Sequence, residues 1–181
     1  MSKLPDPITS PISPEIEEIY NELISKRGYI YDLYRSLLNH PEIAGRIGDL
    51  GSFLRFGAGV LPGSVRELVI LFIARRIGAA YEWVMHVPAA IQEGIPETVI
   101  EAIRTESVPQ GLDQIQQSAL TAVKYVLKRQ SIPQHIQDEL IMVSGVKGVI
   151  ELVVLCGFYQ MIAAIIFAFE IPLPDGKAYP F

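Results

Sequence analysis

Apolar residues recur every three or four positions along most of the chain, in runs that end at Gly or Pro. The first run follows Ser13-Pro14 and stops at Gly28, and Ser before Pro is typical of a helix start. The same criteria predict helices over 31–38, 41–56, 64–77, 79–93, 96–104, 113–129, 133–143 and 147–170. Because period-two alternation between turns is hard to find, the pattern predicts an all-α fold, a helical bundle.

The ends of the chain differ from its helical middle. Prolines at positions 5, 7, 11 and 14 predict an extended N-terminal arm over residues 1–13. Residues 14–170 form the predicted helical domain, and the Pro- and Gly-containing residues 171–181 form a tail. The chain of 181 residues fits one domain.

One segment has two interpretations. Residues 152–169 hold a single strongly polar side chain, Gln160, over a length that a bilayer-spanning helix needs. Glu151 and Glu170 flank the segment, and no Lys/Arg cluster sets an orientation. We therefore expect a buried core or subunit-interface helix and no membrane partner, with a membrane span as the alternative.

Composition narrows the classes of partner. Half of the residues are apolar and 19% are charged, more apolar surface than one small globule can cover, which favours a homo-oligomer. A net charge of -5 argues against a nucleic-acid binder. The single cysteine, Cys156, excludes an internal disulfide and fits a cytoplasmic protein. Three scattered histidines lack the spacing of a metal site, so we expect no metal.

The candidate chemistry lies between residues 67 and 86. If the chain reverses near Gly78, two antiparallel helices form a hairpin and Glu67 can meet His86 across the seam. Glu82 lies four residues before His86 and shares its helix face. Two carboxylates around one imidazole would tune it for proton transfer near neutral pH. We therefore predict His86, Glu67 and Glu82 as catalytic residues.

Simpler roles exist for both carboxylates. Ser64 and Glu67 fit the S-x-x-E capping box of a helix that would begin after Ser64. Glu82 lies in the first turn of its helix, where the helix dipole favours an acid. The sequence leaves these alternatives open.

Two runs carry a family resemblance. Residues 66–71 (RELVIL) and 81–88 (YEWVMHVP), with agreement over 93–104, 151–159 and 170–174, resemble the carboxymuconolactone decarboxylase family and its alkylhydroperoxidase-D-like superfamily. The Tyr-Glu-Trp run is similar to a subgroup without the redox cysteines. Ala79 and Glu82 stand where the alkylhydroperoxidase-D pattern has its Cys-x-x-Cys pair, and His86 matches its histidine.

The resemblance implies a fold and a reaction. It implies a single-domain alkylhydroperoxidase-D-like bundle, assembled as a trimer or hexamer, that decarboxylates a small carboxylated or carbonyl substrate without a cofactor. His86 would be the acid, Tyr81 and Trp83 would line the substrate site, and Arg75 would bind a substrate carboxylate. The alternatives are a peroxiredoxin-like antioxidant protein, which the missing cysteines disfavour, and a non-enzymatic oligomer that binds a small apolar ligand.

Overall fold

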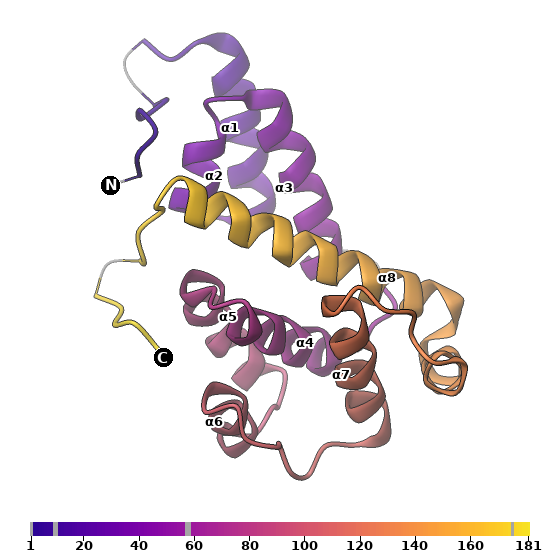
Figure 1. Ribbon diagram of the computed structural model, residues 1–181. Coiled ribbons are helices and arrows are strands. Elements are labelled where there is room, and N and C mark those ends of the chain that lie inside the picture. The colour runs from indigo at the N-terminus through magenta and orange to yellow at the C-terminus, as the bar shows by residue number, and fades with distance from the viewer. Residues whose placement is uncertain (1, 9–10, 57–58, 175) are drawn as a thin grey trace.

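The chain folds into helices joined by short connections (Figure 1). The computed structural model describes residues 2–8, 11–56, 59–174 and 176–181, and within these residues it contains eight helices and no strand. They are α1 (Pro14–Arg27), α2 (Asp32–Leu37), α3 (Pro41–Phe56), α4 (Gly63–Arg76), α5 (Ala80–Gln92), α6 (Glu97–Arg104), α7 (Gln114–Leu127) and α8 (Gln134–Ala168). The predicted all-α class is confirmed.

Helix α4 is the centre of the bundle. It contacts α5, α6, α7 and α8, and its residues from Glu67 to Ala74 are buried on every side. Figure 1 shows α8 crossing the molecule between the α1–α3 group and the α4–α7 group. A helix that is apolar all round needs neighbours on all faces, which explains why α4 lies inside.

The reversal between α4 and α5 is the predicted one. Gly78 adopts a left-handed backbone with φ of 70°, which a residue without a Cβ accepts readily. The Ala79 amide then donates to the Ala74 carbonyl at 2.7 Å, which closes the end of α4. The hairpin therefore runs antiparallel and pairs the start of α4 with the end of α5.

Small residues let α1 approach α3. Gly48 and Gly51 of α3 are buried, and a Cβ at Gly48 would collide with the Leu23 side chain of α1. A Cβ at Gly51 would lie 2.8 Å from Nη2 of Arg27. The glycines therefore set how close these helices lie, and they bring Arg27 toward the middle of the molecule.

Helix α8 contains the break that the sequence predicts between 143 and 147. Gly145 has φ of 66° and ψ of 177°, so two helical segments meet there. The helix is long and apolar enough to cross a bilayer by length and composition, but half of its most apolar window is buried in the fold. That burial favours the core-helix interpretation, because a core helix passes the same test.

One predicted helix start is wrong, and some predictions fall outside the described residues. Helix α4 begins at Gly63 after Pro62, and no side chain caps it, so Ser64 and Glu67 do not form a capping box. Ser13 and Asp113 are helix caps, as predicted. Parts of the predicted arm (residues 1, 9 and 10), interhelical loop (57 and 58) and tail (175) lie outside the described residues.

The described part of the N-terminal arm packs on its own chain. The Lys3 amide donates to the Phe169 carbonyl at 2.9 Å, and Nε of Arg35 donates to Asp6 at 2.9 Å. The arm is therefore tied to α2 and to the end of α8.

Candidate active site

Glu67 and His86 meet across the seam between α4 and α5. The Glu67 Oε2 atom lies 2.7 Å from Nδ1 of His86, and each residue is only 2% exposed. The predicted contact is confirmed. Because both side chains are shielded from water, their charges act on each other more strongly than a surface pair would.

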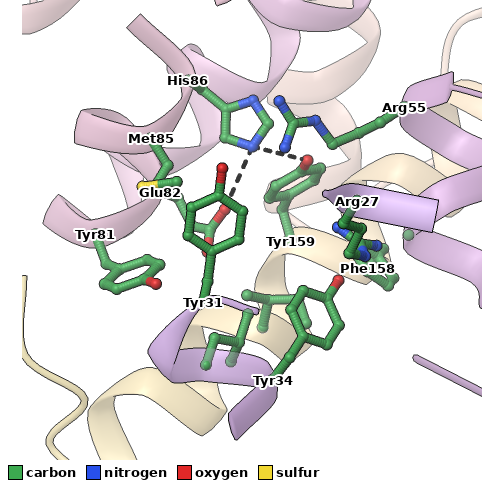
Figure 2. Close-up of a pocket in the computed structure, with 13 residues that line it drawn as sticks. Arg27, Tyr31, Tyr34, Arg55, Tyr81, Glu82, Met85, His86, Phe158 and Tyr159 are labelled. Atoms are coloured by element: carbon green, nitrogen blue, oxygen red, sulfur yellow. Dashed lines mark hydrogen bonds and ion pairs between the residues drawn. The ribbon is translucent and has the colours of Figure 1, made fainter. Parts of the chain in front are cut away.

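The other imidazole nitrogen faces two further polar groups. Nε2 of His86 lies 3.0 Å from the Tyr159 hydroxyl and 3.5 Å from Oε2 of Glu82, as the dashed lines in Figure 2 mark. Glu82 precedes His86 by one helical turn on α5, whereas Tyr159 comes from α8. Sequence reasoning assigned no role to Tyr159, although it lies in one of the segments that resemble the family.

The buried pair has opposed pKa shifts. Burial raises the pKa of the Glu67 carboxyl, but the hydrogen bond and charge of His86 outweigh it, so the net pKa is lowered. Burial lowers the pKa of His86, but hydrogen bonds to Glu67 and Glu82 outweigh it, so the net pKa is raised. Both directions favour an imidazolium–carboxylate pair at neutral pH. Nδ1–H then donates to Glu67, and Nε2–H points toward Tyr159 and Glu82.

A cavity opens beside Nε2 of His86. It lies where α1, α2 and α3 meet α5 and α8, so both halves of the bundle contribute to its wall. The wall is aromatic and aliphatic, with a few polar groups: Arg27, Tyr31, Leu33, Tyr34, Gly51, Arg55, Tyr81, Glu82, Met85, His86, Phe158, Tyr159 and Ile162. Glu67 is not part of this wall. It therefore reaches the cavity only through His86.

Two arginines on the wall were not predicted. The Arg55 side chain reaches from α3 toward the imidazole of His86, and Arg27 lies beside Tyr34 and Phe158 (Figure 2). The positive charge of Arg55 lowers the pKa of Tyr159 against the larger effect of burial, which raises it. The sequence gives one indirect signal for this wall, the glycine spacing on α3 that draws α1 inward.

The three predicted substrate-binding residues do not lie at one site. Tyr81 lines the cavity. Trp83 does not, since its ring packs edge-on against Phe181 at 5.6 Å. Arg75 lines a different, smaller cavity, and its Nε donates to the Arg104 carbonyl at 2.6 Å. The structure therefore places Tyr81, but not Trp83 or Arg75, beside His86.

The only cysteine of the chain, Cys156, is enclosed in the core. It is free and has no exposed surface, and burial raises the pKa of its thiol to about 12. It is not part of the cavity wall. No group of three His, Cys, Asp or Glu side chains is placed to hold a metal ion within the described ranges. The expectation of no metal or cofactor stays a prediction.

Comparison with known families assigns the segment that builds the hairpin. Residues 41–125 match the model of the carboxymuconolactone decarboxylase family. Over this stretch, which is a little under half of the chain, the sequence is similar to the carboxymuconolactone decarboxylase family. The matched segment contains Arg55, Glu67, Glu82 and His86, whereas Arg27 and Tyr159 lie outside it. The subgroup marked by the Tyr-Glu-Trp run stays a prediction.

Solved structures of this fold agree with the assignment. The alkylhydroperoxidase AhpD core of an uncharacterized peroxidase-related protein from Ralstonia eutropha JMP134 aligns with a TM-score of 0.79 at 14% identity, over 96% of this chain and 93% of that chain. The apo debrominase Bmp8 aligns with a TM-score of 0.71 at 14% identity, over 96% and 92%. A cysteine-to-alanine variant of Bmp8 bound to 2,3,4-tribromopyrrole aligns with a TM-score of 0.71 at 14% identity, over 97% of this chain and 92% of that chain.

These similarities establish the alkylhydroperoxidase-D-like fold for this chain. No curated protein matched the sequence.

Proposed function

We propose that this protein is an enzyme that transfers protons to and from a small carbonyl or carboxylated substrate, with decarboxylation as the overall reaction. The observation that carries the proposal is the placement of His86, whose Nδ1 is held by Glu67 while Nε2 faces the cavity. A buried imidazole that is fixed at Nδ1 by one carboxylate, and whose Nε2 meets a hydroxyl and a second carboxylate on the cavity wall, is suited to general acid–base catalysis.

Glu67 and His86 have different roles in this scheme. His86 touches the substrate and is the catalytic residue. Glu67 is a positioning residue, because it bonds Nδ1 and lies behind the cavity wall. It fixes the ring orientation and favours the protonated form of His86. Glu82 lines the cavity and lies close enough to Nε2 to hold or receive the transferred proton.

The decarboxylation balances without a further reactant. The bond between the carboxylate carbon and its neighbour breaks, carbon dioxide leaves, and the electron pair stays on the substrate, delocalised into a carbonyl. Nε2–H of His86 then protonates that carbon, and the imidazole regains a proton from water. The aromatic wall keeps most water away from the anionic intermediate.

Thiol peroxidase activity is the weaker candidate. The thiolate is the nucleophile in that chemistry, and the raised pKa and complete burial of Cys156 keep it protonated and out of reach. The positions of the redox pair in the alkylhydroperoxidase pattern hold Ala79 and Glu82. Neither side chain can form a disulfide.

Self-association is a separate proposal. Exposed apolar side chains follow the outer faces of α3 and α8: Phe53, Phe56, Met142, Val143, Val146, Ile150, Val153 and Val154. Covering such surfaces is what oligomer contacts do. We expect a trimer or hexamer, which light scattering coupled to size exclusion would detect. A monomer at micromolar concentration would contradict it.

The decisive test of the function compares His86→Gln with a matched histidine. Wild-type protein would be assayed for carbon dioxide release and solvent deuterium incorporation on β-keto acids and carboxylated lactones. We expect His86→Gln to lower the rate by about 10²–10⁴-fold, and His135→Gln, at an exposed position on α8, to leave it unchanged. Equal rates in all three proteins would overturn the proposal. Ligand binding without turnover would favour the non-enzymatic alternative.

A further inference from the structure

We propose that Arg27 and Arg55 form a carboxylate-binding subsite on the wall of the cavity that holds His86. The proposed subsite would hold the substrate by its negative charge, while His86 acts on another of its atoms. This inference rests on the proposed function for the identity of the reaction, but anion binding can be measured without turnover.

Neither guanidinium group has a carboxylate partner within the described part of the chain. Nε of Arg27 and Nε of Arg55 are buried without a hydrogen-bond partner among the same residues. Arg27 donates from Nη2 to the Gly48 carbonyl at 3.0 Å, and its guanidinium also interacts with the Tyr34 hydroxyl. Since buried polar groups are nearly always paired, two unpaired Nε atoms on one cavity wall indicate an absent acceptor.

Five other arginines of the chain have a carboxylate oxygen within 4.0 Å: Arg35, Arg66, Arg75, Arg76 and Arg104. Arg46 and Arg129 have no such partner among the described residues, but both are exposed to solvent. The only carboxylate on the wall is Glu82, and its ion-pair partner is His86. The two cavity arginines are therefore left without a negative charge within ion-pair distance in the described chain. An anionic ligand would supply it.

Gly51 lets the side chains of Arg27, Tyr34 and Phe158 come together on this wall. A Cβ at this position would lie 2.8 Å from Nη2 of Arg27 and 2.9 Å from both the Tyr34 hydroxyl and the Phe158 ring. The Arg27 guanidinium also stacks over the Tyr34 ring, with its central carbon 4.2 Å from the ring centroid. This contact fixes the orientation of the guanidinium group. The absence of a side chain at Gly51 therefore places an arginine and a hydroxyl donor next to each other on the cavity wall.

A helix-terminal role does not account for both arginines. Arg27 and Arg55 lie in the last turns of α1 and α3, where a cation favours the helix dipole. Lys26 in the same turn of α1 points to the surface instead and pairs with Asp49 at 2.6 Å. The dipole therefore does not require Arg27 to turn its Nε into an unpaired, buried position.

The charge balance favours a singly charged carboxylate. A guanidinium is always protonated and its fork matches the two oxygens of a carboxylate. Glu82 on the same wall repels a second negative charge, which disfavours a phosphate dianion. The aromatic side chains of the wall favour a carboxylate that is attached to a small planar ring.

The test measures binding of benzoate, with benzamide as its neutral analogue, by calorimetry to the full-length protein. We expect Arg27→Met and Arg55→Met each to weaken benzoate by about tenfold or more and to leave benzamide unchanged. Arg46→Met, an exposed position on α3, should bind benzoate like wild type. Arg55→Lys, which keeps the charge, should retain part of the affinity even if Arg55→Met unfolds.

The outcomes separate this inference from the proposed function. Benzoate affinity that is unchanged in both Arg27→Met and Arg55→Met would overturn the subsite, as would benzamide binding as tightly as benzoate. Inorganic phosphate binding more tightly than benzoate would overturn the carboxylate assignment. The acid–base function is tested separately: if His86→Gln keeps turnover, that function fails while the subsite stands.

Discussion

The Glu67 carboxylate lies 2.7 Å from Nδ1 of His86, although the two residues are 19 positions apart and belong to different helices. Both side chains are buried, so neither charge has water as an alternative partner. Each member helps to keep the other ionised, and Arg66 at 3.3 Å from Oε1 of Glu67 and Glu82 at 3.5 Å from Nε2 of His86 add to the effect. This dependence yields the predictions that follow.

Replacing Glu67 by Gln should separate its positioning role from folding. The variant keeps the size of the side chain but removes the charge that raises the His86 pKa. We expect a rate loss of about tenfold or more, and a loss of about 1–3 kcal/mol in the free energy of unfolding, measured by urea denaturation at pH 7. Glu18→Gln, at an exposed position of α1, is the control. A Glu67→Gln enzyme with wild-type rate and pH profile would contradict the positioning role.

Stability should depend on pH through the same pair. The raised pKa of His86 means that its stabilising contribution is complete below the ordinary value of 6.5 and is lost as the pH rises through the raised value. The lowered pKa of Glu67 means that its contribution is complete above 4.5 and is lost as the pH falls through the lowered value. The free energy of unfolding should therefore decline on both sides of a plateau.

Urea denaturation at a series of pH values tests the predicted loss of stability at high pH. In His86→Gln, the loss of stability that begins above pH 6.5 should disappear, because the group that releases the proton is gone. An alkaline limb of the same size in this variant would assign the transition to another group.

Tyr159→Phe should weaken the cavity side of the imidazole. The hydroxyl lies 3.0 Å from Nε2 in a buried site, and its removal leaves the ring in place. We expect a stability loss of about 1 kcal/mol and a fall in kcat of about fivefold, with far-ultraviolet circular dichroism unchanged. Tyr125→Phe on α7, away from the cavity, is the matched control. A wild-type kcat for Tyr159→Phe would remove the hydroxyl from the mechanism.

Cys156 should be silent in the native protein. Its complete burial and its pKa of about 12 predict no reaction with a thiol-specific reagent until the protein is unfolded. Cys156→Ala should keep the full turnover rate, and its peroxide consumption should equal that of wild type. Rapid stoichiometric labelling of the native thiol, or peroxide consumption that is lost in Cys156→Ala, would revive the peroxidase alternative.

Local sequence signals predicted the hairpin and the two carboxylates that contact His86. Gly78 ends α4 where a left-handed residue is needed, and Glu82 and His86 share a helix face by spacing alone. The alignment of the two antiparallel helices α4 and α5 then places Glu67 opposite His86. Ser64 was a wrong helix start, because α4 begins one residue earlier after Pro62. The Glu67 carboxylate forms its hydrogen bond with His86 and does not cap a backbone amide at the start of α4.

The far wall of the cavity could not be read from local patterns. Arg27, Arg55 and Tyr159 come from three helices whose approach depends on tertiary packing, including the glycine face of α3. Arg75 looked like a substrate ligand because of its charge. It is instead held by the Arg104 carbonyl and stacked at 4.8 Å over Phe181 from the tail, a contact with no local signature.

The most direct measurement is a titration of the His86 ring by ¹⁵N NMR in wild type and in Glu67→Gln. The account expects a wild-type midpoint above 6.5, with Nδ1–H hydrogen-bonded throughout, and a clearly lower midpoint in Glu67→Gln. A wild-type midpoint below 6.5 that does not move in Glu67→Gln would show that the two groups are not coupled, and the acid–base site would have no basis.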